Sequence, residues 1–532
     1  RRYPEYGLRL DASYFENSLV LTAVVPEPCA YLLGSFSLVL VTFGVGGRRS
    51  SRRGQSRNKR VASTANEPHV VSMEFAYVLS KKRSATVWLL SVFSTPFLSQ
   101  PLCADVLEWD GSLGRSYHIA EHWSPEQVPG DGDTAVIRRG RPRTPKLETT
   151  ERVSTLEIQA GAALSDGGGS LFFNSIEVFG TGKAEINPEL RTGGLFNSLR
   201  VDSDEALLIN GTVTDHSTAA VLFVRDGGRV DLAGGFDVDL VQIDDGSPLR
   251  LLGNGNHLGD STSLQLLDGA TFDVNGDSAE SFRNLTGGGD VTLGGGAITI
   301  NYSRNSEFSG TIRESGNVTI SGAILDLTGK LAFDGLLTLT GGSTVFLDNG
   351  DNLTDTVDVH LVDGAFLSLG GFNEGLGAIS GSGDITFFGN TLTTVVDHDS
   401  TFSGVLAGLN LTKEGGATLT LSGNNAYFGT TSIKAGTVRI GGNERLANDS
   451  DVDIASSGRM YLNGHTETID KLTGSGFVDL GAGTLRLGFA DGTGDYDGVI
   501  RGLGGGWVKG GSGALRLSGN SEYSGTTEIH AV

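Results

Sequence analysis

The sequence predicts an all-β protein built as a β-solenoid, and three observations support this prediction. Glycine makes up 80 of the 532 residues, about twice its usual share. Short segments of alternating apolar and polar residues recur between glycine-containing turns, as expected for strands with one buried face. Landmarks in the second half of the chain also repeat at a spacing near 94 residues, which is typical of proteins built from stacked units.

Charge divides the chain into two parts at Ala104. Residues 1–104 carry 13 basic and 6 acidic side chains, whereas residues 105–532 carry 27 and 56, a net charge of −29. Such an acidic chain lacks the basic surface that phosphate binding requires, so we expect no nucleic-acid partner. Both cysteines, Cys29 and Cys103, precede the acidic part, which could therefore cross an oxidising compartment without forming disulfides.

The basic part contains a candidate export signal. A basic cluster at Lys81–Arg83 precedes an apolar run over 85–98, which predicts a signal peptide over 73–104 with cleavage near Ala104. The run is too short to span a bilayer comfortably. A buried core helix is the alternative interpretation of this run.

Residues 1–72 contain a second pattern. Val25-Pro-Glu-Pro28 precedes an apolar stretch over 29–47 and an arginine-rich cluster over 48–60. This arrangement resembles the PEP-CTERM sorting signal, which implies one transmembrane helix with its positive charges on the cytoplasmic side. Because that signal normally ends a protein, we interpret residues 1–72 as the tail of an upstream protein or a misplaced start. A genuine N-terminal anchor is the alternative.

The acidic part contains internal repeats. Residues 411–436 and 507–532 agree at 13 of 26 positions, and a glycine turn recurs at 287–291, 381–385 and 474–478. Duplication is the simplest explanation of several landmarks that keep one spacing. The expected organisation is 1–72 as a PEP-CTERM-like tail, 73–104 as a signal peptide, 105–254 as an N-terminal solenoid region with an opening segment, and repeat units at 255–349, 350–443 and 444–532, the last one truncated.

Each unit is expected to contain about four coils of 20–25 residues, since a propeller blade would repeat at roughly 40–50 residues. Leu, Val, Ile and Phe should face inward, and Thr, Ser, Asp and Asn should face water. No proline follows Pro248, so every backbone N–H beyond it is available for strand pairing.

The sequence also predicts the structural roles of a recurring glycine and of a recurring aromatic residue. Gly423 follows a strand at a corner, so we expect it to adopt a positive φ. Phe333, Tyr427 and Tyr523 hold the same place in three units, each two residues before a glycine. We expect these rings to be buried structural residues that lie against the backbone of the neighbouring glycine.

Leu411–Val438 reads LTKEGGATLTLSGNNAYFGTTSIKAGTV, which resembles the autotransporter-associated β-strand repeat, and Trp507–Val532 is similar to a second copy. Trp109–Asp133 resembles the opening segment of large secreted proteins that carry such repeats. The resemblance implies a right-handed parallel β-helix exposed on, or released from, a Gram-negative cell surface. Such passengers normally precede a translocator barrel, so we expect the barrel to be absent or to lie beyond Val532.

Two short motifs are similar to catalytic patterns. His118-Ile-Ala-Glu121-His122 matches the inverted zinc-protease pattern, but its surroundings are too short for the helix that presents such ligands. Gly259-Asp-Ser261 is similar to a hydrolase nucleophile turn but lacks the strand–turn–helix context. We expect neither motif to be functional.

Two carboxylate clusters, Asp244-Asp245 and Asp397-His398-Asp399, have side chains suited to acid–base catalysis or calcium binding. Aspartate is also common at turns, and the two clusters do not recur together, so we interpret them as turn residues. No catalytic residue, cofactor or metal site is therefore expected.

We expect an exported, surface-exposed β-solenoid that is a passenger-like structural or adhesin-type protein without catalysis. Its expected partners are cell-surface or extracellular-matrix components, glycans among them, and it should meet a membrane only through its leader segments or a missing barrel. The alternative is a β-helix polysaccharide lyase or glycoside hydrolase. A groove lined with convergent Asp, Lys and Arg side chains would favour that alternative.

Overall fold

The computed structural model describes residues 9–15, 18–24 and 104–530, apart from 193–195, 203–204, 215–220, 245, 278–279, 302–305, 323, 349, 351 and 363. The chain forms two units, Arg1–Thr95 and Pro96–Val532. In the first unit, β1 (Arg9–Phe15) pairs antiparallel with β2 (Ser18–Val24). The PEP-CTERM-like stretch and the signal peptide up to residue 103 lie outside the described residues and stay predictions. Within the described part, no helix is both long and apolar enough to cross a membrane.

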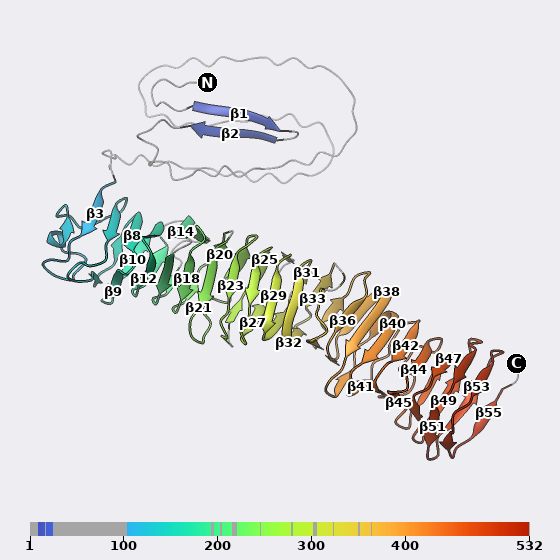
Figure 1. Cartoon of the computed structure of the whole chain (residues 1–532). Coiled ribbons are helices and arrows are strands. Elements are labelled where there is room, and N and C mark those ends of the chain that lie inside the picture. The colour runs from blue at the N-terminus through green and yellow to red at the C-terminus, as the bar shows by residue number, and fades with distance from the viewer. Residues whose placement is uncertain are drawn as a thin grey trace, which may run out of the picture. The chain divides into compact units, whose positions relative to one another are not determined.

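The second unit is a parallel β-solenoid of about 19 turns, which runs from β3 at one end to β55 at the other (Figure 1). Strands of neighbouring turns pair in parallel. Ile176 pairs with Leu199, Leu199 with Val224, and Val224 with Ile243, which are offsets of 23, 25 and 19 residues. The all-β solenoid and the expected length of its coils are thereby confirmed. The helical element described in this unit is the 3₁₀ helix η2 (Ala120–His122).

Three columns of strands form the faces of the solenoid, which we call faces A, B and C in the order in which the chain visits them. Face A consists of β3 (Val106–Trp109), β5 (Thr134–Ile137), β8 (Thr155–Gln159), β11 (Ser175–Phe179), β14 (Phe196–Val201), β17 (Val221–Arg225), β20 (Leu240–Ile243), β22 (Ser263–Leu266), β25 (Asn284–Gly287), β28 (Ser306–Phe308), β31 (Ile324–Leu327), β33 (Thr344–Leu347), β35 (Phe366–Ser368), the first halves of β38 (Asp384–Val395) and β40 (Leu406–Glu414), then β46 (Thr466–Ile469), β49 (Thr484–Leu487), β52 (Gly506–Lys509) and β55 (Thr527–Ile529), with β4 (Trp123–Ser124) antiparallel to β3.

Face B consists of β6 (Lys146–Leu147), β9 (Ala163–Asp166), β12 (Gly182–Ile186), β15 (Glu205–Ile209), β18 (Arg229–Leu232), β21 (Pro248–Leu251), β23 (Thr271–Asp273), β26 (Asp290–Thr292), β29 (Thr311–Ser315), the first half of β32 (Lys330–Thr340), β36 (Glu374–Leu376), the second halves of β38 and β40, β42 (Thr430–Ile433), β44 (Asp451–Ile454), β47 (Lys471–Gly474), β50 (Gly494–Tyr496) and β53 (Leu515–Leu517).

Face C consists of β7 (Glu151–Arg152), β10 (Ser170–Phe173), β13 (Glu189–Thr192), β16 (Val213–Thr214), β19 (Phe236–Asp237), β24 (Glu280–Phe282), β27 (Ala297–Asn301), β30 (Asn317–Ser321), the second half of β32, β34 (Val357–Leu361), β37 (Ile379–Gly381), β39 (Ser400–Phe402), β41 (Thr418–Leu421), β43 (Gly436–Ile440), β45 (Gly458–Tyr461), β48 (Phe477–Asp479), β51 (Val499–Gly502) and β54 (Glu522–Tyr523).

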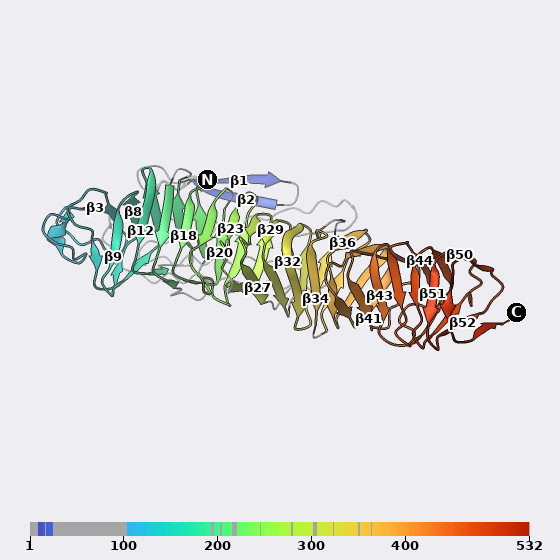
Figure 2. The same ribbon diagram turned by 60° about the horizontal axis from the view of Figure 1, so that its bottom comes forward.

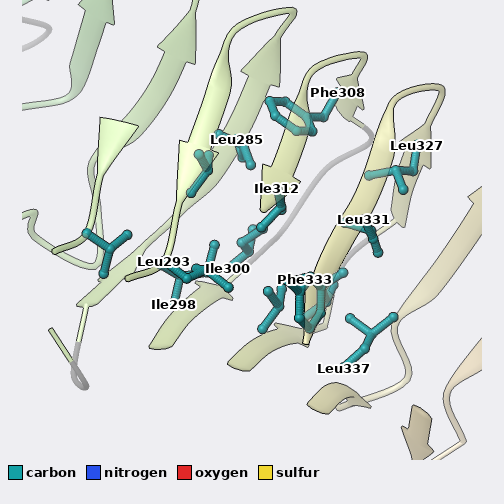
Figure 3. Close-up of a cluster of buried hydrophobic side chains, with 14 of the residues drawn as sticks. Leu285, Leu293, Ile298, Ile300, Phe308, Ile312, Leu327, Leu331, Phe333 and Leu337 are labelled. Atoms are coloured by element: carbon teal, nitrogen blue, oxygen red, sulfur yellow. The ribbon is translucent and has the colours of Figure 1, made fainter. Parts of the chain in front are cut away.

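The core is a continuous stack of apolar side chains inside the three faces. Burial alternates along most strands, as in β8, where Leu156 and Ile158 are buried between half-exposed neighbours. Figure 3 shows the same arrangement further along, where Phe308 of β28, Ile312 of β29 and Leu331 of β32 are buried in the interior. This pattern confirms the expected inward and outward positions, because a period of two places alternate side chains on opposite sides of a strand.

The repeat does not match a whole number of turns. From Glu280 on face C, four successive pairings lead through Ile298, Val318 and Leu337 to Val359. The corresponding glutamate of the next unit, Glu374, follows two faces later, on face B. A unit therefore makes about four and two-thirds turns rather than four, and each landmark moves to a different face in the next unit.

Stacked glycines explain one set of recurring landmarks. A Cβ atom added at Gly404 or Gly423 would lie 1.7 Å from the carbonyl oxygen of Gly383 or Gly404, respectively. Gly423 is not among the positive-φ residues, so our expectation about its φ is wrong. It is glycine because the backbone of the previous turn occupies the place of a side chain. The same close approach links Gly289–Gly310–Gly329 and Gly476–Gly498–Gly519.

Aromatic residues also divide into two rows. Phe333 and Tyr427 are buried, as expected for structural residues, and Tyr523 near the end is partly buried. A second row consists of Phe308, Phe402 and Tyr496, each of which has its ring against a glycine two residues later; the Cζ atom of Phe402 is 3.0 Å from the Cβ position of Gly404. The three atoms nearest to the Cβ positions of Gly335, Gly429 and Gly525 belong to other residues, and the expected contact of Phe333, Tyr427 and Tyr523 with these glycines stays a prediction.

Candidate functional site

The motif at His118, Glu121 and His122 does not bring ligands together. Its only helix is the three-residue η2, so the two histidines do not share a helical face. His118 and Glu121 are exposed, whereas His122 is buried with its Nδ1 atom 2.7 Å from the carbonyl oxygen of Ser116. The His122 ring packs edge-on against Trp109. These contacts give His122 a structural role in the first turn.

Ser261 and Asp244 also have no catalytic partner among the described residues. Ser261 lies in an exposed turn just before β22, away from any helix of the described residues. Asp244 lies 2.9 Å from the Arg225 Nε atom and accepts a 2.7 Å hydrogen bond from Gln242. Asp245 lies outside the described residues.

The second carboxylate cluster links neighbouring turns. His398 Nδ1 is 2.7 Å from an exposed oxygen of Asp397. Asp399 accepts a 2.8 Å hydrogen bond from the backbone N–H of Thr418, one turn further along the chain. That hydrogen bond holds the pKa of the Asp399 carboxyl below its ordinary value. The hydrogen bond to Thr418 thus accounts for Asp399 as a structural residue of the turn.

Three buried glutamates, which the sequence analysis did not single out, bridge gaps in the strand columns. Glu280, Glu374 and Glu467 lie on faces C, B and A, and 94 and 93 residues separate them. Their common spacing was the signal that could have revealed them. Each accepts hydrogen bonds from two consecutive backbone N–H groups of the previous turn: His257 and Leu258 (2.9 and 2.8 Å) for Glu280, Asn352 and Leu353 (3.4 and 2.7 Å) for Glu374, and Arg445 and Leu446 (both 2.8 Å) for Glu467.

We call these contacts the glutamate bridges. Each replaces the backbone pairing that is missing at that point, because buried N–H groups require a partner. Burial raises the pKa of Glu280 and raises that of Glu467 to about 8, despite the two N–H donors that favour the charged form.

The Glu280 bridge lies in a group of three side chains, His257, Asp277 and Glu280, of the types that bind metal ions and close enough together to share one. His257 Nδ1 lies 2.9 Å from Asp277 and 3.5 Å from Glu280, and all three side chains are buried. Hydrogen bonding to Glu280 raises the pKa of His257. A protonated His257 between the carboxylates of Asp277 and Glu280 therefore gives these side chains a charge partner without a metal ion. We therefore interpret this group as a buried ion pair.

The lysine and the tyrosine of the repeat motif form hydrogen bonds that hold the loops between strands of the solenoid. Lys413 is buried, its Nζ atom donates to the carbonyl oxygens of Glu414, Gly415 and Ala435, and burial lowers its pKa to about 8. In the second copy, Lys509 donates to Gly510 and Gly511. The hydroxyls of Tyr427 and Tyr523 lie 2.8 and 2.6 Å from those of Thr431 and Thr527.

Face C carries a group of arginine and aromatic side chains on β43, β45, β48 and β51. Figure 2 shows β43 and β51 towards the C-terminal end of the solenoid. In β43, β45, β48 and β51, the inward residues are Val438, Met460, Val478 and Ile500, all fully buried. The intervening residues therefore point outward. They form what we call the arginine–aromatic face: Arg439, Arg459, Tyr461, Phe477, Asp479 and Arg501.

The arginine–aromatic face is an ordered surface. Arg439 pairs with Tyr461, Tyr461 with Asp479, and Asp479 with Arg501, so these four residues form one row across four turns. The Arg439 guanidinium lies 5.9 Å from the centre of the Tyr461 ring. Beside this row, Phe477 lies between the guanidinium groups of Arg459 and Arg501, at 5.9 and 5.2 Å from its ring centre.

Two open hollows meet on this face. One is lined by Arg439, Tyr461 and Asn463, the other by Arg501 and Glu522, and both include Asp479. Asp479 is held by a 2.8 Å hydrogen bond from the backbone N–H of Gly481. The arrangement offers guanidinium donors, aromatic rings and two carboxylates, a set suited to polar ligands with apolar ring faces.

Comparison with known families defines the class of repeat. Residues 411–440 and 508–531 match the model of the passenger-associated-transport-repeat family. These two segments contain the buried Lys413 and Lys509 and the two Tyr–Thr contacts described above. Two segments of the solenoid are therefore similar to passenger-associated transport repeats, which agrees with the resemblance found in the sequence.

Individual relatives are much longer than this chain. The chain is similar to the adhesin BmaC autotransporter of Brucella suis biovar 1 (strain 1330), with 32% identity over 280 residues, 46% of this chain and 8% of the adhesin. It is also similar to the uncharacterized protein YuaQ of Escherichia coli (strain K12), with 35% identity over 75 residues, 14% of this chain and 6% of that protein. The chain thus spans less than a tenth of either relative. No solved structure matches it.

Proposed function

We propose that the chain is part of an exported autotransporter passenger that is exposed on the surface of a Gram-negative cell and acts as an adhesin-type protein without catalysis. The observation that carries this proposal is its similarity over 280 residues to an autotransporter adhesin. The two segments similar to passenger-associated transport repeats support it independently.

The fold supplies a mechanism for such a role. Each turn contacts mainly its neighbours, so the solenoid can fold progressively as the chain emerges from the cell. The net charge of −29 over residues 105–532 keeps the solenoid soluble and repels other anionic surfaces. Adhesion then depends on the outward side chains, while the inward ones maintain the rod.

The proposal is tested by comparing a strain without this gene, the parent strain and a complemented strain for attachment to cultured cells and to matrix-coated surfaces. The expected result is fewer attached bacteria without the gene and restored attachment on complementation. Equal attachment by all three strains would contradict the proposal.

The alternative is a polysaccharide lyase or glycoside hydrolase. The observation in its favour is that arginines and Asp479 lie together on the arginine–aromatic face. Most glycosidases place two carboxyl groups on either side of the scissile bond. Here Glu522 is the other acidic side chain lining the hollows, and it lies 3.9 Å from Arg501. The set fits binding better than hydrolysis, and release of shortened chains from a polysaccharide would favour the enzyme.

A further inference from the structure

The arginine–aromatic face contains two arginines that lie beside aromatic rings and have no acidic partner among the described residues. Elsewhere Arg225, Arg229 and Arg313 each contact a carboxylate on the same or a neighbouring strand. Among the described residues, Arg439 and Arg459 have no carboxylate within ion-pair distance and lie beside aromatic rings instead. The Arg439 Nε atom is buried without a hydrogen-bond partner.

An arginine stacked beside a ring keeps the outer edge of its guanidinium group available for a bidentate contact with an anion. Arg439 and Arg501 lie three strands apart in one row, which is about 14 Å at the usual spacing of about 4.8 Å between strands. A row of this length can contact several units of an extended chain rather than one small molecule.

Charge and ring chemistry together indicate the ligand. The three arginines outnumber the two carboxylates beside them, Asp479 and Glu522, so this face has a local excess of positive charge on an otherwise acidic solenoid and can attract anions. Tyr461 and Phe477, whose ring centres are 6.2 Å apart, add apolar surface on which C–H groups of a sugar ring can pack. Asp479 offers an acceptor for a sugar hydroxyl.

We propose that the arginine–aromatic face binds an acidic polysaccharide, whose carboxylate or sulfate groups contact the arginines, and that this polysaccharide belongs to the surface to which the cell attaches. The inference rests on the proposed adhesin function and names the chemical class of its ligand. The chain of sugars runs along the solenoid axis, because the binding groups come from successive turns.

The test uses the full-length chain and measures binding to immobilised heparin, polygalacturonate and hyaluronan, with neutral dextran as the uncharged probe. The variant is Arg439→Gln combined with Arg459→Gln. The control is Arg200→Gln, which removes an exposed arginine from β14 on face A. Unfolding midpoints of all three proteins establish that each is folded.

We expect binding to at least one acidic polysaccharide and none to dextran, with affinity at least tenfold lower in the double variant and within twofold of the unmodified chain in the control. Added salt should weaken binding. Equal affinity of the double variant, or no binding to any acidic probe, would overturn the inference. Shortening of a bound polysaccharide would overturn it too, since the face would then be catalytic.

Cell attachment separates this inference from the proposed function. If the gene is required for attachment but the double variant attaches normally, the adhesin function stands and the arginine–aromatic face is not its binding site. If attachment does not require the gene, the adhesin proposal itself is wrong.

Discussion

At the level of single residues, the repeat motif describes how a turn is closed. Lys413 donates hydrogen bonds to backbone carbonyl oxygens, and Tyr427 is buried with its hydroxyl within hydrogen-bond distance of the Thr431 hydroxyl. The sequence was sufficient to predict that Tyr427 is structural, because its apolar ring recurs at a fixed place. It was insufficient for Gly423, since a pattern of glycines does not distinguish a positive φ from a close approach of two backbones.

Gly423→Ala should destabilise the solenoid by about 2–4 kcal/mol, because its new Cβ atom would require the backbone of Gly404 to move. Gly416→Ala is the matched control, since a Cβ atom there meets no atom within 4 Å. Denaturant unfolding of both variants checks this prediction. Equal midpoints for the two variants would contradict the glycine stacking.

Tyr427→Ala should lower the free energy of unfolding by about 2–4 kcal/mol, close to the cost of truncating a buried aromatic side chain. Tyr427→Phe should lower it by about 1 kcal/mol, because it removes only the hydroxyl contact with Thr431. Binding by the folded Tyr427→Ala variant should be unchanged. If Tyr427→Ala kept its stability but lost binding, the ring would be a recognition residue.

At the level of strands, the glutamate bridges explain how a column continues where its ladder is interrupted. Glu280, Glu374 and Glu467 each satisfy two backbone N–H groups from the previous turn. Single-sequence reasoning did not identify them, because it considered acidic residues only where they cluster, and each of these glutamates is a lone acidic residue in a strand. Aligning the units by their 94-residue period would have shown one glutamate in the same place three times.

The Glu467 bridge predicts a specific pH dependence. Because burial raises the pKa of Glu467 to about 8, the folded chain retains a proton that the unfolded chain releases between about pH 4.5 and 8. The contribution of Glu467 to stability should therefore fall as pH rises through this range, by about 2–4 kcal/mol.

Glu467→Gln should remove this part of the pH dependence, which is measured as the difference in unfolding free energy between variant and unmodified chain at pH 5 and pH 8. Asp397→Asn, at an exposed carboxylate, is the control. A difference that stays constant between the two pH values would show that Glu467 is charged in the folded chain.

At the level of the whole solenoid, the sequence predicted the fold class and the length of the coils but not the geometry of the repeat. The repeat period gives the number of residues in a unit, but it does not show how many times those residues pass around the solenoid axis. The face on which each repeated residue lies could therefore not be predicted. Because one unit makes about four and two-thirds turns, Glu280, Glu374 and Glu467 fall on three different faces. The surface consequently changes from face to face, and the arginine–aromatic face has no counterpart one unit earlier at the same angle.

Removal of one complete unit should preserve the fold. Deleting residues 281–374 joins equivalent positions, so the remaining turns should continue with every strand paired and unfold cooperatively. Deleting residues 281–364 joins positions that are not equivalent and should leave strands out of register, with a broader and earlier transition. Similar transitions for the two deletions would contradict the assignment of the repeat.

The central claim, that this solenoid is a passenger displayed on the cell surface with the described register, is tested most directly by labelling single cysteines on intact cells. Thr401→Cys places a thiol on an exposed position of β39, and Val452→Cys places one on a buried position of β44. The unmodified chain, which has Cys29 and Cys103, gives the background. A membrane-impermeant maleimide should label Thr401→Cys on intact cells as strongly as after lysis, and should label Val452→Cys only after unfolding. Labelling of Thr401→Cys that requires lysis, or equal labelling of both positions in the folded chain, would contradict the account.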